Sequence, residues 1–199
     1  MQIAIVLMAL LALALTLTAF VVPRLNSYSF NGILLQSPQP ASDFTLTSHY
    51  GQEVTLSDYR DRVVLLFFGY ANCPDVCPAT LADLKQAMLA LGNEAEQVQV
   101  FMVSVDPERD SQADLAAFVP AFHPSFVGLT GSPDEVAEIA TYYGVYFAKQ
   151  ESDSALGYLV DHTATVMLVD PDGYLRMVFP FDTEAEGIAS DISYLLSRQ

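Results

Sequence analysis

The two cysteines of the chain lie within one five-residue segment, Cys73-Pro74-Asp75-Val76-Cys77. Thiolates are nucleophiles as well as soft metal ligands, and sulfur atoms this near in sequence can chelate one ion or form a disulfide. The apolar run 63–69 precedes the segment and an amphipathic pattern follows it, which places the cysteines between a predicted strand and a predicted helix. Because a helix N-terminus favours thiolates, the segment is predicted to be a reactive or metal-binding dithiol. The spacing does not choose between these two roles.

The composition favours copper if the dithiol binds a metal. Structural zinc sites usually have four protein ligands, and the sequence has no further cysteine. Thiolates suit Cu(I), and imidazole suits copper in either oxidation state. We predict that His49 and His123 are surface residues, whereas His162 opens a late strand that is expected beside the central strand. The pattern alone leaves His162 as either a ligand or a hydrogen-bonded residue at a strand edge.

The elements around the dithiol predict an α/β domain. Residues 43–56 alternate on both sides of Tyr50-Gly51, which indicates a hairpin. The run 63–69 is continuously apolar and short, as is typical of a central strand covered on both faces. The other predicted elements are a helix at 81–91, a strand at 97–105, a helix at 112–122, a strand at 126–129, a helix from Pro133 with a capping box of Ser132 and Glu135, strands at 164–169 and 174–179, and a last helix capped by Thr183 with Glu186.

The N-terminal quarter differs from the rest of the chain. Residues 3–22 form a run of twenty without a charge, long enough as a helix to cross a hydrocarbon core of about 30 Å. We therefore expect a single transmembrane anchor, or an uncleaved signal, at 1–23, a tether at 24–42 and one globular domain at 43–199. Arg24 by itself favours a cytoplasmic domain. The formal net charge of −16 should repel nucleic acid.

Three ordered stretches resemble one known family. The segment FGYANCPDVCP at 68–78 resembles the signature of the Sco/SenC family, the copper proteins of cytochrome c oxidase assembly. VSVDPERD at 103–110, GLTG at 128–131 and the Asp161-His162 pair are similar to the other recurrent stretches of that family, in the same order. The resemblance implies a thioredoxin-like fold, a central mixed sheet flanked by helices, and a copper site, for Cu(I) or Cu(II), formed by Cys73, Cys77 and His162.

The resemblance also implies a place and a function. It implies a single-pass membrane protein whose domain lies in the periplasm or an equivalent extracytoplasmic space. The leading expectation is a copper metallochaperone that delivers copper to the copper-bearing subunit of cytochrome c oxidase, with another copper chaperone as a further partner. The alternative is a thiol-disulfide oxidoreductase that reduces the copper-binding cysteines of the oxidase through Cys73 and Cys77. A peroxidase of the peroxiredoxin type ranks last, because Tyr70 stands where that class has Thr or Ser.

Two acidic features lie near the predicted ligands. Asp75 and Asp161 are sequence neighbours of the proposed ligands, and we predict that they orient the imidazole or raise ligand basicity through hydrogen bonds. The alternative is that both are solvated loop acids. The acidic stretch 106–110 follows a predicted strand, and it is interpreted either as a rim that contacts a partner or as a loop that caps itself.

Overall fold

The structure is a computed structural model that describes residues 7–8, 10–12, 16, 28–151 and 157–198. The chain divides into two compact units, Met1–Phe30 and Asn31–Gln199. Within the described ranges, no helix is both long enough and apolar enough to cross a membrane. The predicted anchor at 1–23 lies largely outside the described residues.

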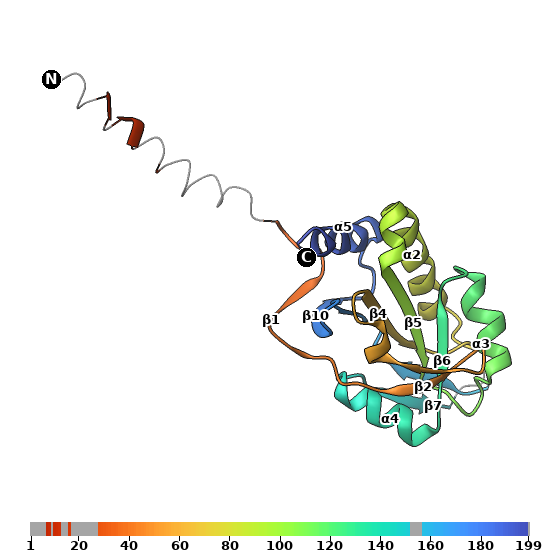
Figure 1. The fold of residues 1–199 in the computed structure, drawn as a ribbon. Helices are drawn as coiled ribbons and strands as arrows, with labels where there is room; N and C mark the ends of the chain where they lie inside the picture. The colour runs from red at the N-terminus through yellow and green to blue at the C-terminus, as the bar shows by residue number, and fades with distance from the viewer. Residues whose placement is uncertain (1–6, 9, 13–15, 17–27, 152–156, 199) are drawn as a thin grey trace. The chain divides into compact units, whose positions relative to one another are not determined.

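A mixed eight-stranded sheet forms the centre of the second unit (Figure 1). Its strands, in spatial order, are β1 (Ile33–Pro40), β10 (Tyr174–Phe179), β9 (Val166–Val169), β4 (Val63–Gly69), β5 (Val98–Ser104), β6 (Val127–Thr130), β2 (Thr45–Ser48) and β3 (Glu53–Thr55). Strand β4 runs parallel to β5 and antiparallel to β9, and β5 runs parallel to β6. Every residue of β4 is buried, which confirms the predicted central strand.

Helices cover both faces of this sheet. They are α2 (Val76–Leu91), α3 (Gln112–Phe118), α4 (Pro133–Tyr142) and α5 (Ala185–Leu196), with short 3-10 helices η1 (Leu56–Tyr59), η2 (Gly92–Gln97) and η3 (Val119–Ala121). Figure 1 shows α2 and α5 side by side on one face, where they contact each other, and α4 on the opposite face. Side chains alternate between the two faces along β4. Phe68 points to the α4 side, where its ring centroid lies 6.0 Å from that of Tyr143, whereas Phe67 points to the side of α2.

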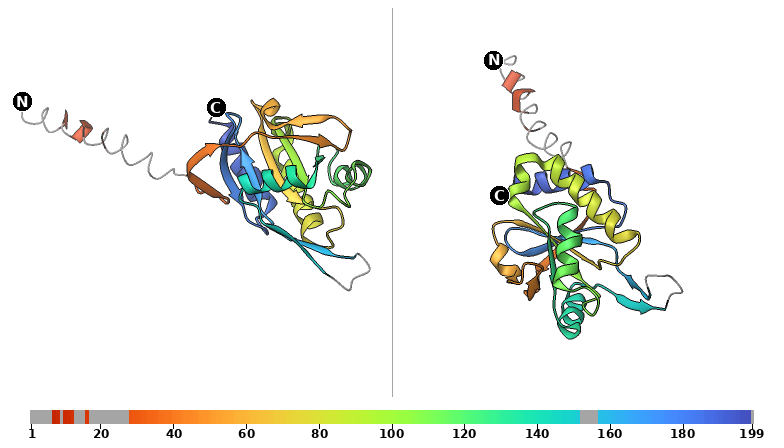
Figure 2. Two further views of the ribbon diagram at one scale, coloured as in Figure 1. Left: turned by 90° about the horizontal axis from the view of Figure 1, so that it is seen from below. Right: turned by 90° about the vertical axis from the view of Figure 1, so that its right-hand side faces the viewer.

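A second, two-stranded antiparallel sheet carries His162. It consists of β7 (Phe147–Gln150) and β8 (Leu159–His162), paired in register from Phe147 opposite His162 to Gln150 opposite Leu159. Figure 2 shows this β7–β8 ribbon extending away from the main sheet. The late strand predicted at 164–169 is β9, and it pairs with the central strand β4 as expected. The prediction that His162 opens this strand is wrong, because His162 ends β8 in the second sheet.

Local sequence signals predicted several elements correctly. Strands β2 and β3 pair as the expected hairpin. Ser132 and Glu135 form the capping box that begins α4, since the Ser132 side chain accepts from the Glu135 N–H and the Glu135 carboxylate accepts from the Ser132 N–H. Strands β9 and β10 pair as expected around residues 171–173.

Three local predictions are wrong. Residues 33–40 of the predicted tether form β1, an edge strand whose side chains are mostly exposed and therefore lack an apolar alternation. Helix α2 begins at Val76, five residues before the predicted start at residue 81. The prediction missed these residues because the first turn of the helix lacks the amphipathic pattern. Thr183 does not cap α5: its hydroxyl donates to the carbonyl of Pro180 at 2.7 Å, and Glu184 takes the N-cap position without a side-chain hydrogen bond.

Candidate metal centre

The cysteine segment spans the junction between β4 and α2. Strand β4 ends at Gly69, and α2 begins at Val76, so that Cys77 lies in the first helical turn. The N–H of Cys73 donates to the carbonyl of Tyr70 at 3.3 Å. The N–H of Cys77, one of the free donors of the first turn, donates to the Cys73 sulfur at 3.3 Å. The helix N-terminus is therefore directed at the Cys73 sulfur, as expected from the sequence.

The structure brings His162 to the two cysteines. The Nε2 atom of His162 lies 3.3 Å from the Sγ atom of Cys77, and the three potential ligand atoms of Cys73, Cys77 and His162 all lie within 4.8 Å of one another. The Nδ1 atom of His162 is 3.2 Å from the carbonyl oxygen of Thr163. A carbonyl can only accept, so this contact places a proton on Nδ1, and Nε2 is the ring nitrogen that faces the sulfurs.

Gly69 allows α2 to approach the end of β4. A Cβ atom at this position would lie 2.7 Å from the ring of Phe67 and 3.0 Å from the Cys77 sulfur. The first distance is too short for a real carbon contact and the second is unusually tight, so a side chain here would force the Phe67 ring to move and would crowd the buried thiol. The ring of Phe67 in turn packs edge-on against His162, with the ring centroids 6.1 Å apart.

The two thiols have opposite protonation preferences. The hydrogen bond from the Cys77 side chain lowers the pKa of Cys73 to about 3, and the contacts with His162 and with the N–H groups of Asp75 and Cys77 act in the same direction. The same hydrogen bond with Cys73, together with burial, raises the pKa of Cys77. The metal-free site therefore holds a thiolate at Cys73 and a neutral thiol at Cys77 near neutral pH.

An open cleft of about 340 Å³ leads to this site. Cys73, Tyr70 and His162 line it together with apolar residues from both sides, which include Val76 and Leu159. The Cys73 side chain is half-buried, whereas Cys77 is completely buried behind it. A reactant or a metal ion that enters the cleft therefore meets Cys73 and His162 before Cys77.

The donor set suits copper. Two thiolates and one imidazole are ligands that copper accepts, and the absence of a further cysteine in the sequence argues against a closed four-sulfur zinc site. Metal–ligand bonds of about 2.0–2.3 Å need donor atoms no more than roughly 4.6 Å apart. The observed separations of up to 4.8 Å are close to that limit. The site can therefore hold one soft ion with small adjustments of the side chains.

The carboxylates of Asp75 and Asp161 lie at the surface. Asp75 occupies the N-cap position of α2 without a side-chain cap hydrogen bond. Asp161 precedes His162 in a strand and therefore points to the opposite face of the β7–β8 ribbon. Among the described residues, no hydrogen bond joins either carboxylate to His162, whose Nδ1 atom contacts the backbone carbonyl of Thr163. Their supporting role stays a prediction.

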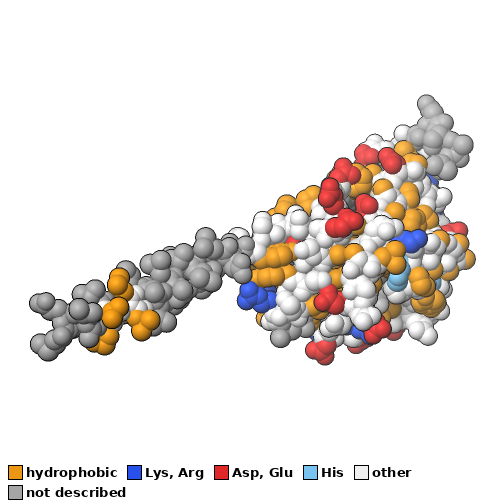
Figure 3. Space-filling model, turned by 90° about the horizontal axis from the view of Figure 1, so that it is seen from above, with side chains coloured by type: hydrophobic (Ala, Val, Ile, Leu, Met, Phe, Trp, Pro, Cys, Tyr) orange, Lys and Arg blue, Asp and Glu red, His pale blue; other side chains and the backbone are white. Residues whose placement is uncertain are grey.

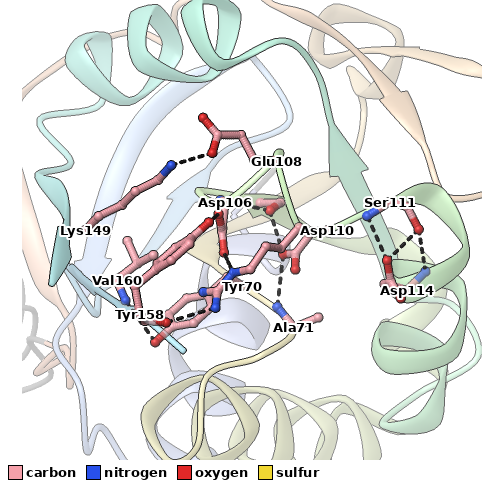
Figure 4. A network of polar contacts seen from close by, with 12 residues as sticks. Tyr70, Ala71, Asp106, Glu108, Asp110, Ser111, Asp114, Lys149, Tyr158 and Val160 are labelled. Atoms are coloured by element: carbon pink, nitrogen blue, oxygen red, sulfur yellow. Dashed lines mark hydrogen bonds and ion pairs between the residues drawn. The ribbon is translucent and has the colours of Figure 1, made fainter. Parts of the chain in front are cut away.

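Asp110 and His49 are buried, which their positions in the sequence did not indicate. Asp110 is 1% exposed, and its Oδ2 atom accepts from the Ser104 hydroxyl at 2.6 Å and from the Ala71 N–H at 3.0 Å (Figure 4). It fixes the backbone two residues before Cys73, and burial raises its pKa. His49 is buried rather than on the surface, and its Nδ1 atom accepts from the Gly128 N–H.

The acidic stretch 106–110 is a self-capping turn. The N–H groups of Arg109 and Asp110 donate to the carbonyl of Asp106, and the Asp106 N–H donates to the Ser104 hydroxyl. Both aspartates are buried, so their carboxylates do not form an exposed rim. The sequence correctly placed the stretch 106–110 after a strand, but the charges of its aspartates did not indicate that their side chains are buried.

Comparisons with known proteins agree with this geometry. The family model described as SCO1/SenC matches residues 35–197. The chain is 38% identical over 161 residues to Protein SCO2 homolog, mitochondrial, of Mus musculus, covering 80% of this chain and 63% of that protein. It is 35% identical over 158 residues to Protein SCO1 homolog, mitochondrial, of Homo sapiens, covering 78% and 52%. The chain thus spans less than two thirds of the length of these relatives.

Solved structures show the same fold. The apo Sco1 protein of Thermus thermophilus is 44% identical with a TM-score of 0.76, covering 85% of this chain and 99% of that structure. Arabidopsis thaliana ScoI with copper bound is 30% identical with a TM-score of 0.75, covering 81% and 100%. These similarities confirm the expected thioredoxin-like α/β fold, a mixed sheet flanked by helices. The chain belongs to the SCO1/SenC family.

Proposed function

We propose that this protein is a copper metallochaperone, which binds one copper ion through Cys73, Cys77 and His162 and delivers it to the copper centre of cytochrome c oxidase during assembly. The observation that carries the proposal is the convergence of two Sγ atoms and one Nε2 atom within 4.8 Å, from segments 85 residues apart. The relative from Arabidopsis thaliana was solved with copper bound, which supports the same cargo here.

The geometry of the cleft supports transfer as well as binding. A site with three protein ligands leaves room for an incoming thiolate, and ligand exchange can then proceed one bond at a time. Cys73 lies at the cleft surface and Cys77 lies behind it, so we infer that the bond to Cys73 is the first to be replaced. The copper-bearing subunit of the oxidase, and another copper chaperone as donor, are the partners that this function requires.

We further propose that residues 1–23 anchor the protein in a membrane and that the domain lies on the extracytoplasmic side. The uncharged run 3–22 supports the anchor, and relatives named as mitochondrial proteins support a domain outside the cytosol. The compact unit that begins at Asn31 supports a domain start before residue 43. The face in Figure 3 carries more acidic than basic side chains, which favours partners with basic surfaces.

The thiol pair also supports a second function, thiol-disulfide exchange. A half-buried thiolate at Cys73 can attack an external disulfide, which releases one partner sulfur as a thiolate and leaves a mixed disulfide. Cys77 can then give up its proton and attack the Cys73 sulfur, which releases the second partner sulfur and leaves a Cys73–Cys77 disulfide. In this role the protein would reduce the copper-binding cysteines of the oxidase. The two functions share both sulfurs and differ in their need for His162.

Metal titration of the reduced full chain in detergent tests the proposal. We expect one copper ion per chain, and we expect His162→Ala to weaken Cu(II) binding and to impair oxidase assembly in cells. His123→Ala is the matched control, because His123 bonds Ser125 away from the cleft. An unchanged Cu(II) affinity in His162→Ala would refute the site. Normal assembly in that variant, with loss of assembly in Cys73→Ser, would favour thiol-disulfide exchange.

A further inference from the structure

The position of His162 relative to the cysteines presents a structural problem. Cys73 and Cys77 lie on the junction of β4 and α2, within the main sheet and its helical layer. His162 lies at the end of β8, whose strand partner is β7 and not a strand of the main sheet. The sheet hydrogen bonds therefore do not fix the imidazole over the sulfurs. Other contacts must hold the β7–β8 ribbon in place.

A partly buried cluster of four side chains makes these contacts. We infer that Tyr70, Asp106, Arg109 and Tyr158, here called the tyrosine–arginine cluster, position His162 for metal binding. The inference rests on the proposed copper site and adds positioning residues to it. Tyr70 follows β4, Asp106 and Arg109 follow β5, and Tyr158 directly precedes β8. The cluster therefore connects the ribbon to two loops of the main sheet.

Arg109 is the centre of the cluster. Its Nε atom donates to the Asp106 carboxylate in an ion pair, and its Nη1 atom donates to the backbone carbonyl of Tyr158 at 2.9 Å. Its guanidinium carbon lies 3.6 Å from the centroid of the Tyr158 ring and 5.9 Å from that of the Tyr70 ring. The planar fork of arginine makes these contacts simultaneously, which a lysine ammonium cannot do.

Tyrosine hydroxyls close the connection on both sides (Figure 4). The Tyr158 hydroxyl donates to the Oδ1 atom of Asp106 at 2.6 Å, and the Tyr70 hydroxyl accepts from the Val160 N–H at 3.2 Å. Tyr158, directly before β8, and Val160, within β8, are thus held by the loops that follow β4 and β5. Side chains two residues apart share a face of a strand, and His162 is the next in this series. Its ring packs edge-on against Tyr70, with centroids 5.9 Å apart.

Burial separates this cluster from an ordinary surface contact. The Asp106 side chain is 0% exposed and that of Arg109 is 22% exposed, whereas the neighbouring pair of Lys149 and Glu108 is 48% and 58% exposed. Exposed ion pairs hold side chains weakly because water and salt screen them. The Lys149–Glu108 pair also joins the ribbon to the loop after β5, but the less exposed tyrosine–arginine cluster sets the position of the imidazole.

Substitutions that keep the fold can test this role. Arg109→Lys keeps the charge beside Asp106 and loses the fork, and Tyr158→Phe keeps the ring and loses the hydroxyl. Arg176→Lys is the matched control, because two nitrogens of the Arg176 guanidinium donate to the carboxylate of the largely buried Asp170. This pair lies near the start of β4, where Val64 pairs with Val169, and the cysteines follow the other end of that strand. Removing supporting contacts of metal ligands typically costs about 10- to 100-fold in metal affinity. We expect that loss of Cu(II) affinity in Arg109→Lys and Tyr158→Phe, and less than a twofold change in Arg176→Lys.

Each substitution is then repeated in the His162→Ala background, using the reduced full chain in detergent and Cu(II) as the probe. If the cluster acts through the imidazole, its substitutions have no further effect once the imidazole is gone. The nitrogen coupling in the paramagnetic resonance spectrum of the Cu(II) form should weaken in Arg109→Lys, a change that a general loss of stability does not produce.

The outcomes separate this inference from the proposed function. An equal loss of affinity with and without His162 shows a general structural role and refutes the inference, and so does an unchanged affinity in both cluster variants. An unchanged affinity in His162→Ala alone refutes the copper site itself, and the inference falls with it. A loss in Arg109→Lys and Tyr158→Phe that disappears without His162 supports it.

Discussion

Lowering the pH should leave the reactivity of Cys73 almost unchanged down to pH 5. Its pKa is lowered to about 3, first by the hydrogen bond from the Cys77 side chain. A thiol with that pKa is about 99% ionised at pH 5 and changes by about 1% between pH 5 and 8. A free thiol with a pKa of about 8.5 loses roughly 800-fold of its thiolate over the same range.

The absolute rate of alkylation does not discriminate between these cases. Intrinsic nucleophilicity falls with the pKa, with a slope of about 0.4–0.5. A thiolate whose pKa is about 3 is therefore roughly 300-fold less nucleophilic than one whose pKa is about 8.5, which offsets its larger thiolate fraction near pH 6. The shape of the pH profile is the informative quantity.

The assay is alkylation of the reduced, copper-free full chain with iodoacetamide between pH 5 and 8, with each cysteine followed by mass spectrometry. We expect a flat profile at Cys73 and little modification of the buried Cys77. Cys77→Ala removes the main hydrogen-bond donor, so the pKa of Cys73 should rise and a pH dependence should return. A tenfold rise in rate per pH unit at Cys73 of the unmodified sequence would refute the thiolate assignment.

Two further substitutions test the packing around the site. Gly69→Ala forces the Phe67 ring or the Cys77 sulfur to move. We expect urea titration to show a loss of about 1–3 kcal/mol in the free energy of unfolding, and we expect weaker copper binding. If neither quantity changed, the close packing at Gly69 would be contradicted. Asp191→Ala leaves the N–H groups of Asn31 and Gly32 without their buried acceptor, which should lower the free energy of unfolding by about 1–3 kcal/mol, whereas the exposed Asp134→Ala should change it little.

The part of the site that depends on local sequence could be predicted. The continuous apolar run of β4 and the spacing of Cys73 and Cys77 are properties of one short segment, and the strand-to-helix junction follows from them. The capping box of Ser132 and Glu135 is equally local. In each case the interacting groups lie within a few residues of one another in the sequence. The local pattern of residue types is therefore enough to predict how they are arranged.

The part that depends on distant contacts could not be predicted. The β7–β8 ribbon has a polar, half-exposed sequence, including Lys149 and Asp161, because it lies outside the main sheet, and no apolar alternation marks it. Asp110 reads as a surface acid, and only the fold shows that it binds the Ala71 N–H from 39 residues away. The resemblance to a family, and not periodicity, selected His162 as the third ligand.

The division of the ligands between two parts of the fold connects the two candidate functions. The sulfurs of Cys73 and Cys77 belong to the β4–α2 junction, and oxidation of this pair to a disulfide would remove two of the three ligands at once. The imidazole of His162 is held from the β7–β8 ribbon by the tyrosine–arginine cluster, so its contribution can change while the dithiol stays intact. Thiol exchange needs the junction alone, whereas copper binding through all three ligands needs the junction and the ribbon together. A substitution that loosens the ribbon should therefore separate copper binding from thiol chemistry, which no substitution of either cysteine can do.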